Sequence, residues 1–213
     1  MSPYVPKEYW YERGKTYKDK FRHNKMYNLQ EQTLLDYLKS ITPFSTVLEV
    51  GCGFGRITKI ILSNFPEIKA YTAVDLSPHQ IENAKKYVRS EIFGRNLSLK
   101  FIVSEILSLD IDRKFDLVIA SEVLLHILPE EIDNVISKLV RLSNEHVINI
   151  DYYQEIIPKG LASHNFAHEY EKIYRAIPDI IRLKRIPIVK QGLFSKLDAK
   201  QSIFHAFVKT IPE

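Results

Sequence analysis

Three glycines at alternate positions follow a short apolar segment, and this pattern predicts a ligand-binding loop. Residues 46–50 are rich in valine and leucine, as a buried strand requires. Gly51, Gly53 and Gly55 come directly after it. Glycine has no Cβ, so the loop can adopt positive φ angles and a ligand can lie against its backbone. Asp75 ends a second apolar segment twenty residues later. This order of elements is the layout of a nucleoside site: a strand, a glycine loop, a helix, a second strand and an acid. In such a site the carboxylate accepts hydrogen bonds from ribose hydroxyls.

The spacing of the glycines distinguishes between nucleoside ligands. Dinucleotide-binding loops have the pattern G-x-G-x-x-G, whereas this chain has G-x-G-x-G with Arg56 in the position of the third glycine. The loop also lacks the lysine and hydroxyl pair of a triphosphate-binding P-loop. The alternative to a nucleoside site is a tight strand–helix turn without a ligand. Arg56 is either part of the site or simply the first residue of the helix that follows.

Two segments resemble the class I S-adenosylmethionine-dependent methyltransferases. They are E-V-G-C-G-F-G at residues 49–55 and V-D-L-S at residues 74–77, within a resemblance that covers residues 44–151. The resemblance implies S-adenosylmethionine as the cofactor. The residues that it assigns to cofactor binding are Glu49, Gly51, Cys52, Gly53, Gly55, Asp75, Leu76, Ser104, Glu105, Ile106 and Ser121.

Each assigned group has an implied role. The glycines would lie along the methionine portion of the cofactor, and Glu49 would face its ammonium group. Asp75 would accept hydrogen bonds from the ribose, and Leu76 would pack on the adenine. Glu105 stands where members of the family usually have an aspartate. Cys52 is the only cysteine, which excludes an internal disulfide. We interpret it as a small residue in a tight place rather than a nucleophile, since no histidine is its neighbour in the sequence.

Composition indicates an ordinary globular protein. The chain has 213 residues, of which 45% are hydrophobic and 26% charged, and its net charge is +4. Its apolar runs are too short to span a bilayer and no secretory signal is visible, so we expect a cytoplasmic protein without a membrane partner. The basic excess at both ends of the chain either is solvated or meets an anionic substrate. Nucleic acid is an unlikely partner, because the chain has no basic run or aromatic RNA-binding motif.

Periodicity and turn signals predict alternating strands and helices. The expected helices are 8–23, 28–39, 55–65, 77–89, 129–142 and 169–177. The expected strands are 46–50, 70–75, 99–103, 115–120, 146–151, 181–189 and 202–208. The last two should pair as a hairpin whose loop starts at Gln191-Gly192.

This order predicts an α/β fold: a doubly wound, mostly parallel seven-stranded sheet with helices on both faces and an antiparallel C-terminal strand at one edge. We expect a single domain over residues 1–213. It would contain an N-terminal helical lid or substrate segment (1–43), a cofactor-binding core (44–151), and a substrate-side insertion with the C-terminal hairpin (152–213).

Two histidines are candidates for catalysis. His126 follows the fourth strand in the segment S-E-V-L-L-H, where a histidine is common in the family. It either fixes the segment or acts as a general base. His168 belongs to H-E-Y, which resembles a His-Asp-Tyr element of some small-molecule and sugar methyltransferases. The alternative there is a helical first turn with an acid near the helix dipole. A histidine base predicts a rate that rises with pH through about 6–7.

Aromatic and titratable residues outside the cofactor core gather in two places, which we expect to contact the substrate. The predicted substrate-binding residues are Trp10, Arg13, Tyr17, His164 and Tyr170. The spacing between His164 and His168 would suit a metal only on a helix, and a third ligand is missing, so no metal is predicted.

The acceptor class follows from the segment after the fourth strand. It lacks the Asp/Asn-Pro-Pro-Tyr/Phe motif of enzymes that methylate amino groups of DNA bases. Its S-E-V-L sequence with a downstream histidine resembles the corresponding segment of methyltransferases that act on small molecules, sugars and lipids. This resemblance implies O-methylation of a small molecule or a glycan. The alternatives are a protein or RNA methyltransferase of the same fold and a non-catalytic nucleoside-binding module. The oligomeric state stays open.

Overall fold

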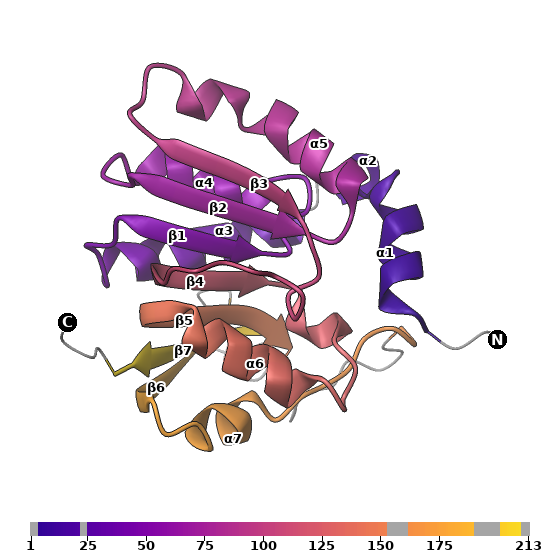
Figure 1. The fold of residues 1–213 in the computed structure, drawn as a ribbon, viewed down its shortest axis with the longest axis vertical. Helices are drawn as coiled ribbons and strands as arrows, with labels where there is room; N and C mark the ends of the chain where they lie inside the picture. The colour runs from indigo at the N-terminus through magenta and orange to yellow at the C-terminus, as the bar shows by residue number, and fades with distance from the viewer. Residues whose placement is uncertain (1–3, 22–24, 153–161, 190–200, 210–213) are drawn as a thin grey trace. The chain divides into compact units, whose positions relative to one another are not determined.

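The structure is a computed structural model that describes residues 4–21, 25–152, 162–189 and 201–209. The chain consists of two compact units, unit 1 (residues 1–110) and unit 2 (residues 111–213). Its strands form a seven-stranded sheet in the order β3-β2-β1-β4-β5-β7-β6 (Figure 1).

Unit 1 contains three described strands that run parallel: β1 (Thr46–Val50), β2 (Ala70–Asp75) and β3 (Ser98–Val103). Its described helices are α1 (Pro6–Gly14), α2 (Tyr17–Phe21), α3 (Lys25–Lys39), α4 (Arg56–Asn64), α5 (Pro78–Tyr87) and the short 3₁₀ helix η1 (Arg89–Ile92). In Figure 1, α4 passes behind β2. In the strand register Val50 lies opposite Val74, and Asp75 lies opposite Val103. The three carboxyl ends therefore lie at one edge of unit 1, which brings the segments after them together.

Local sequence explains where α5 begins. Ser77 occupies the N-cap in an extended conformation, and its Oγ accepts a hydrogen bond from the N–H of Gln80. Pro78 follows as the first helical residue, where its missing N–H costs nothing. Only two residues separate β2 from α5, so the end of β2 and the first turn of α5 lie close together.

Unit 2 combines parallel and antiparallel strands. The strands are β4 (Phe115–Ser121), β5 (Ser143–Tyr152), β6 (Ile180–Pro187) and β7 (Gln201–Val208). β4 and β5 are parallel, whereas β7 is antiparallel to both β5 and β6. The described helices are α6 (Ile132–Arg141), α7 (Tyr170–Arg175) and the 3₁₀ helix η2 (Leu124–His126). α6 covers the front of β5 in Figure 1.

The predicted fold class is confirmed, and the predicted elements all have counterparts among the described residues. β1 and β2 have the predicted bounds. The predicted pairing of the two C-terminal strands is confirmed, although the antiparallel strand β7 lies between β5 and β6 rather than at the edge. The predicted loop at Gln191-Gly192 lies outside the described residues.

Two predicted helices differ from those in the structure. The expected helix over 8–23 consists of two, α1 and α2, which are separated after Gly14. The expected helix over 129–142 begins only at Ile132. The preceding residues form a turn in which the N–H of Glu131 donates to the carbonyl of Leu128. Because of this turn, α6 begins after Pro129, the residue that the sequence predicted as its start.

The core consists of apolar strand residues together with the inner faces of the helices. Val47, Leu48, Leu117 and Val118 are fully buried, which explains the apolar runs in β1 and β4. No helix in the described ranges is both long and apolar enough to cross a membrane.

Candidate functional site

The glycine loop wraps around the carboxylate of Asp75 in unit 1. The N–H of Gly53 donates to Asp75 Oδ2 at 2.8 Å, and the N–H of Ser77 donates to Oδ1 at 2.8 Å. Gly51, Gly53 and Gly55 have φ angles of 68°, 55° and 89°. Other residues adopt such angles only at a cost, so the loop requires its glycines. The structure thus brings together the loop and the acid that the sequence predicted to act together.

The backbone at Gly53 is open, whereas that at Gly55 is enclosed. Among the described residues, a Cβ atom at Gly53 would meet only Gln80 Nε2 within 4 Å, at 3.8 Å. A Cβ atom at Gly55 would lie 3.1 Å from Ala84 Cα and 3.1 Å from Val88 Cγ1. Gly55 therefore lets α4 pack closely on α5, and Gly53 leaves its backbone accessible to a ligand.

Two carboxyl groups with raised pKa values lie at this loop. Glu49 is 2% exposed, and its Oε2 accepts hydrogen bonds from Thr58 Oγ1 and, at 2.7 Å, from Tyr71 OH. Burial raises the pKa of Glu49 to about 7, and burial raises the pKa of Asp75 to about 6, although hydrogen bonds oppose both shifts. Withdrawal from water penalises the charged form of a carboxyl group. A cation bound beside these groups would favour that form, so the electrostatics of the loop suit a cationic ligand.

The apolar residues predicted for the cofactor lie in or near this region. Cys52 is buried in the loop, and burial raises the pKa of its thiol well above the usual value. Such a thiol is a poor nucleophile, as the small-residue interpretation expects. Leu76 is half-buried directly after Asp75, and Ile106 is 9% exposed.

The residues after β3 differ in their surroundings. The N–H of Ser104 donates to the backbone carbonyl of Asp75 at 3.1 Å, which places Ser104 beside the site. The exposed carboxylate of Glu105 instead forms an ion pair with Lys7 of α1 at 3.0 Å. Glu105 thus contacts the N-terminal helix, a partner that the sequence did not indicate.

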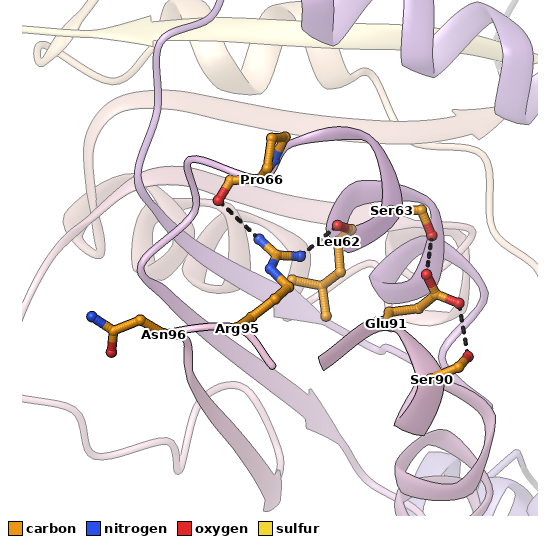
Figure 2. Close-up of a pocket in the computed structure, with 7 residues that line it drawn as sticks. All are labelled: Leu62, Ser63, Pro66, Ser90, Glu91, Arg95 and Asn96. Atoms are coloured by element: carbon orange, nitrogen blue, oxygen red, sulfur yellow. Dashed lines mark hydrogen bonds between the residues drawn. The ribbon is translucent and has the colours of Figure 1, made fainter. Parts of the chain in front are cut away.

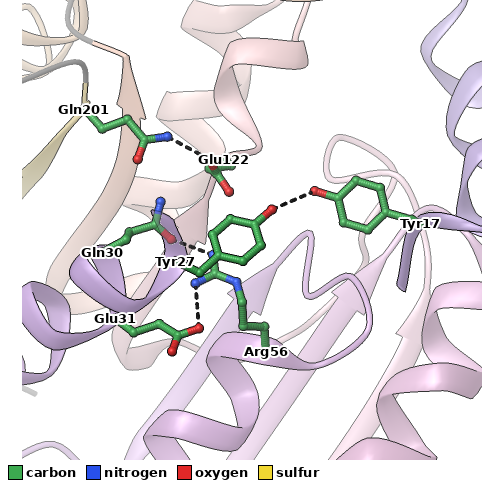
Figure 3. Close-up of polar contacts among 7 residues, drawn as sticks. All are labelled: Tyr17, Tyr27, Gln30, Glu31, Arg56, Glu122 and Gln201. Atoms are coloured by element: carbon green, nitrogen blue, oxygen red, sulfur yellow. Dashed lines mark hydrogen bonds and ion pairs between the residues drawn. The ribbon is translucent and has the colours of Figure 1, made fainter. Parts of the chain in front are cut away.

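Arg56 is held by side chains of α3 (Figure 3). Its Nη2 donates to Gln30 Oε1 at 2.6 Å, its Nη1 pairs with Glu31 Oε1 at 3.2 Å, and the guanidinium lies 4.0 Å from the ring centroid of Tyr27. The side chain is 13% exposed. These contacts give Arg56 a structural role between α3 and α4.

The predicted substrate residues of the N-terminal segment lie on α1 and α2. The ring centroid of Tyr17 is 5.9 Å from that of Trp10 and 6.4 Å from that of Phe54 in the glycine loop. The hydroxyl groups of Tyr17 and Tyr27 are 3.4 Å apart (Figure 3). Arg13 lies half-buried in the last turn of α1. The aromatic residues of this segment therefore reach the glycine loop through Tyr17.

The C-terminal end of α1 packs tightly on the start of α5. A Cβ atom at Gly14 would lie 2.1 Å from Ser77 Oγ and 3.3 Å from Gln80 Cγ, so any larger residue would force the two helices apart. The rings of Tyr11 and His79 also meet, with centroids 5.6 Å apart. α1 thus covers the residues that follow Asp75.

In unit 2, the residue after β4 has an unusual backbone conformation. Ser121 ends the strand, and Glu122 has a φ angle of 57°. The N–H of Glu122 donates to the carbonyl of Ile150 at 2.8 Å, and its Oε1 accepts a hydrogen bond from Gln201 Nε2 at 2.7 Å (Figure 3). Such a conformation is costly for a residue with a side chain and persists only where its surroundings hold it. Contacts from β5 and β7 provide that support.

His126 contacts the irregular segment before α7. Its Nδ1 is 3.1 Å from the carbonyl oxygen of His164, and the two imidazole rings stack with centroids 5.5 Å apart. A carbonyl only accepts, so Nδ1 carries the proton and the lone pair is on Nε2. Burial lowers the pKa of His126 to about 4. His126 is therefore neutral at physiological pH, and its titration lies below the range of about 6–7 that the sequence suggested.

His168 and Tyr170 lie deeper in unit 2. His168 is 5% exposed, and its Nε2 is 3.1 Å from the carbonyl oxygen of Ile127. Burial lowers the pKa of His168. Tyr170 is 2% exposed and its ring centroid lies 5.0 Å from that of Phe204. The structure thus gives both residues positions in the core rather than at a surface that a substrate could reach directly.

The segment 162–169 is irregular, so His164 and His168 do not share a helix face as a metal site at this spacing would require. In the parts of the chain that the structure describes, no three histidine, cysteine or acidic residues are grouped so as to hold a metal ion.

Sequence reasoning missed a buried polar network behind the segment after β4. Asp151 is fully buried, with Oδ1 accepting from the N–H of Leu125 at 3.2 Å and Oδ2 accepting from Asn149 Nδ2 at 2.8 Å. Asn149 Oδ1 in turn accepts from Tyr174 OH at 3.0 Å. Burial raises the pKa of Asp151 well above its usual value. Asn149 and Asp151 are neighbours on β5, but Leu125 lies 26 residues before Asp151 and Tyr174 lies 25 residues after Asn149, so no local pattern signals the network.

A surface depression at the other end of α4 has a structural explanation (Figure 2). Arg95 donates to the carbonyl oxygens of Leu62 at 2.5 Å and Pro66 at 3.2 Å, and so caps the C-terminal end of α4. Glu91 accepts hydrogen bonds from the hydroxyl groups of Ser63 and Ser90. These polar groups satisfy one another, so the depression carries no sign of a ligand.

Residues 48–145 match a family model described as a methyltransferase domain. A malonyl-[acyl-carrier protein] O-methyltransferase of Priestia megaterium is 40% identical over 75 residues, which are 35% of this chain and 25% of that protein. The chain thus spans about a quarter of the length of this relative.

Two solved structures share the fold over almost the whole chain. The N-methyltransferase NodS of Bradyrhizobium japonicum, in complex with S-adenosyl-L-homocysteine, has a TM-score of 0.74 at 18% identity and covers 98% of this chain and 100% of its own. Magnesium protoporphyrin IX methyltransferase of Synechocystis, with bound SAM, has a TM-score of 0.69 at 19% identity with the same coverage. At these identities the likeness concerns the fold.

Proposed function

We propose that the glycine loop of unit 1 binds S-adenosylmethionine and that the protein transfers its methyl group, as the match of residues 48–145 to a methyltransferase domain supports. The observation that carries this proposal is the combination of an open backbone at Gly53 with the carboxyl groups of Glu49, which is buried, and Asp75, which is half-buried. The cofactor is cationic at its sulfur and carries an ammonium group, so it suits this electrostatic environment. The fold neighbours with bound SAM and S-adenosyl-L-homocysteine support the same cofactor.

The residues present fit this ligand. Each carboxylate oxygen of Asp75 accepts one backbone N–H and has a second lone pair, with which it would accept from the ribose hydroxyls. Both described hydrogen bonds of Glu49 reach Oε2, so Oε1 is the atom that would face the ammonium group. The bound cofactor supplies a methyl group on a positively charged sulfur that is ready for in-line displacement. The protein has to orient it and exclude water.

We assign the acceptor to the class of hydroxyl or carboxyl oxygens on a small molecule, either free, attached to a carrier, or part of a glycan. The S-E-V-L-L-H segment after β4 favours small acceptors, and the Priestia megaterium relative is named an O-methyltransferase of a carrier-linked malonyl group.

We assign the role of general base for a hydroxyl acceptor to His126 rather than His168. His126 is half-buried with its lone pair on Nε2, whereas His168 is almost completely buried. The pKa of His126, about 4, means that the rate should be independent of this histidine's protonation from pH 6 upwards. A carboxylate acceptor would need no base, so His126→Ala would then leave the rate almost unchanged. With a hydroxyl acceptor the loss should be about 10²–10⁴-fold.

Isothermal titration calorimetry with S-adenosylhomocysteine tests cofactor binding. Asp75→Asn replaces an acceptor-only carboxylate with an amide and should weaken binding by roughly 10- to 100-fold, the scale for a hydrogen bond to a charged group. Glu82→Gln, an exposed change on α5, is the matched control and should bind as the wild type does. Absence of binding by the wild type, or tighter binding of NAD, would contradict the proposal.

A radiolabelled methyl-transfer screen then identifies the acceptor class. Small hydroxyl and carboxyl compounds, glycans, acyl-carrier conjugates, protein and RNA are offered separately. We expect incorporation into one of the first three. Transfer to protein or RNA alone would leave the cofactor assignment intact and overturn the acceptor assignment.

A further inference from the structure

Asn165 lies in the irregular segment of unit 2 that packs against η2. The residue before it is bonded to η2, because the carbonyl oxygen of His164 accepts from His126 Nδ1 at 3.1 Å. The residue after it is bonded there too, because the N–H of Phe166 donates to the carbonyl of Leu125 at 2.6 Å. The imidazole rings of His164 and His126 also stack, with centroids 5.5 Å apart. Asn165 is thus held beside the ring of His126 by its own neighbours in the chain.

The side-chain oxygen of Asn165 is buried and has no hydrogen-bond donor in the described part of the chain. Asn149 provides a comparison, since it is fully buried but its Oδ1 accepts from Tyr174 OH at 3.0 Å. Buried amide groups are nearly always paired, because an unpaired one loses its hydration without compensation. The oxygen of Asn165 therefore requires a donor that another state of the protein supplies.

Protonation of His126 supplies such a donor. In the neutral ring Nδ1 donates to His164 and Nε2 carries a lone pair, whereas in the imidazolium Nε2 is a donor as well. Burial is the largest cause that lowers the pKa of His126 to about 4, and the charge of His164, the titratable residue beside it, lowers that pKa further. The carbonyl of His164 and the side-chain amide of Asn165 raise it. A group that raises the pKa of a base stabilises its protonated form.

We propose that Asn165 is a positioning residue for His126, whose Oδ1 accepts a hydrogen bond from the Nε2–H that forms when His126 removes the proton of a hydroxyl acceptor. This inference rests on the proposed function. In that step the O–H bond of the acceptor breaks and its proton goes to Nε2. The electron pair of the oxygen forms the bond to the methyl carbon, the sulfur keeps the electrons of the bond that breaks, and the proton later leaves Nε2 to water. Burial makes the imidazolium unfavourable, so an oxygen already in place beside it favours the proton transfer.

The pKa of His126 in the cofactor-free protein tests this contact without any substrate, by NMR titration of isotope-labelled histidine. Asn165→Asp keeps an oxygen at the site and gives it a charge, so it should raise this pKa by roughly 1–3 from its value of about 4. Asn165→Leu removes the oxygen, so at pH 4 the ring should be largely neutral, whereas that of the wild type is about half protonated. Ser163→Asp, an exposed change in the same segment, is the matched control and should shift the pKa by no more than roughly a few tenths, because water screens its charge.

Two further measurements distinguish this role from a purely structural one. At pH 7 Asn165→Leu removes an unpaired acceptor, so the thermal midpoint should stay the same or rise. Asn149→Leu is the matched control, because it removes the acceptor of the Tyr174 hydroxyl and should lower the midpoint. In methyl transfer to a hydroxyl acceptor, Asn165→Leu should lower kcat by roughly 10-fold with KM unchanged. Asn165→Asp should restore most of this rate at a pH above the raised pKa of its His126.

Several results would overturn the inference. A pKa of His126 that Asn165→Asp leaves unchanged, or shifts no more than Ser163→Asp does, would remove the contact and leave the proposed function standing. A loss of stability in Asn165→Leu as large as that in Asn149→Leu would show that Oδ1 already has a partner. Unchanged kcat with a hydroxyl acceptor would show that the contact does not serve the reaction.

Transfer to a carboxylate alone would overturn this inference and the assignment of His126 as the base, while the cofactor assignment would stand. A wild type that does not bind S-adenosylhomocysteine would remove the proposed function together with this inference, whatever the titration shows.

Discussion

Asp75 has a structural role in addition to its predicted role in ligand binding. Its two oxygens hold the N–H groups of Gly53 and Ser77, which fixes the glycine loop against the start of α5. A change at Asp75 therefore alters the loop and the ribose contact together. The raised pKa of about 6 shows that the folded chain stabilises the charged carboxylate incompletely without a ligand.

The glycines of the loop should differ in what they tolerate. Gly53→Ala places a side chain at a positive φ angle without a close contact and should cost about 1–2 kcal/mol. Gly94, which lies outside the loop after η1, also has a positive φ angle and open space around it, so Gly94→Ala is a control that should cost the same. Gly55→Ala adds a contact of 3.1 Å with Ala84, so it should cost roughly 2–4 kcal/mol. Urea unfolding of the three variants measures these differences. Equal losses would show that the contact between α4 and α5 adjusts freely.

Among the elements, β5 and β7 are joined by a buried pair of histidines. His205 Nε2 is 3.1 Å from His146 Nδ1, and the residues are 0% and 9% exposed. One ring must donate and the other accept, so the pair is stable only when at least one imidazole is neutral. Burial lowers the pKa of His205 to about 2, and Lys184 and Arg182 of β6 contribute to this shift. Burial also lowers the pKa of His146.

This histidine pair should make folding depend on pH. An unfolded histidine titrates near 6.5, so on acidification residue 205 is protonated in the unfolded chain while it stays neutral in the folded protein. The contribution of His205 to the free energy of unfolding is complete above pH 6.5, and it is lost as the pH falls towards the lowered pKa of the folded residue. Between pH 7 and pH 5 the loss should be about 2 kcal/mol for one such group.

Comparison with His205→Phe isolates this contribution, because the variant keeps a ring but cannot be protonated. The raised pKa values of Glu49 and Asp75 act in the opposite direction, since their contribution is lost as the pH rises through about 7 and 6. They are common to both proteins and cancel in the difference. Denaturant unfolding at pH 7 and pH 5 should show a smaller acid loss in the variant. Parallel pH dependences would contradict the assignment to His205.

For the whole molecule, the fold likeness extends much further than the sequence likeness. Two solved methyltransferases cover 98% of the chain at less than 20% identity, whereas the Priestia megaterium relative matches only 35% of it. The described strands and helices thus share the fold of these two structures well beyond the segment that matches in sequence. The family model covers residues 48–145, which include the glycine loop and Asp75, and this is why the cofactor is the better supported part of the proposal.

Ligand binding in unit 1 should be visible in the unfolding of the protein. S-adenosylhomocysteine at a hundred times its dissociation constant should add about 2.7 kcal/mol of stability. For a chain of this size the midpoint should rise by roughly 5–10 °C in scanning calorimetry. If the two units unfold in separate transitions, only that of unit 1 should shift. At the same ligand concentration Asp75→Asn should shift less, and an equal shift would argue against a ligand at this loop.

The sequence by itself determined the features that depend on neighbouring residues. The apolar runs of β1 and β2, the three glycines between them and the acid at Asp75 are encoded within thirty residues, and so are the serine cap and the proline that start α5. Such signals act through local backbone preferences, which a short segment has regardless of where it lies in the fold. The glycine loop and the carboxylate of Asp75 could therefore be predicted from the sequence.

Tertiary structure alone decided the features that join distant segments. Lys7 pairs with Glu105, His126 Nδ1 donates to the carbonyl oxygen of His164, and β7 lies between β5 and β6. Burial of Gln80 likewise depends on α1, which lies more than sixty residues earlier. No local pattern specifies these contacts, because each joins residues that meet only after the chain has folded.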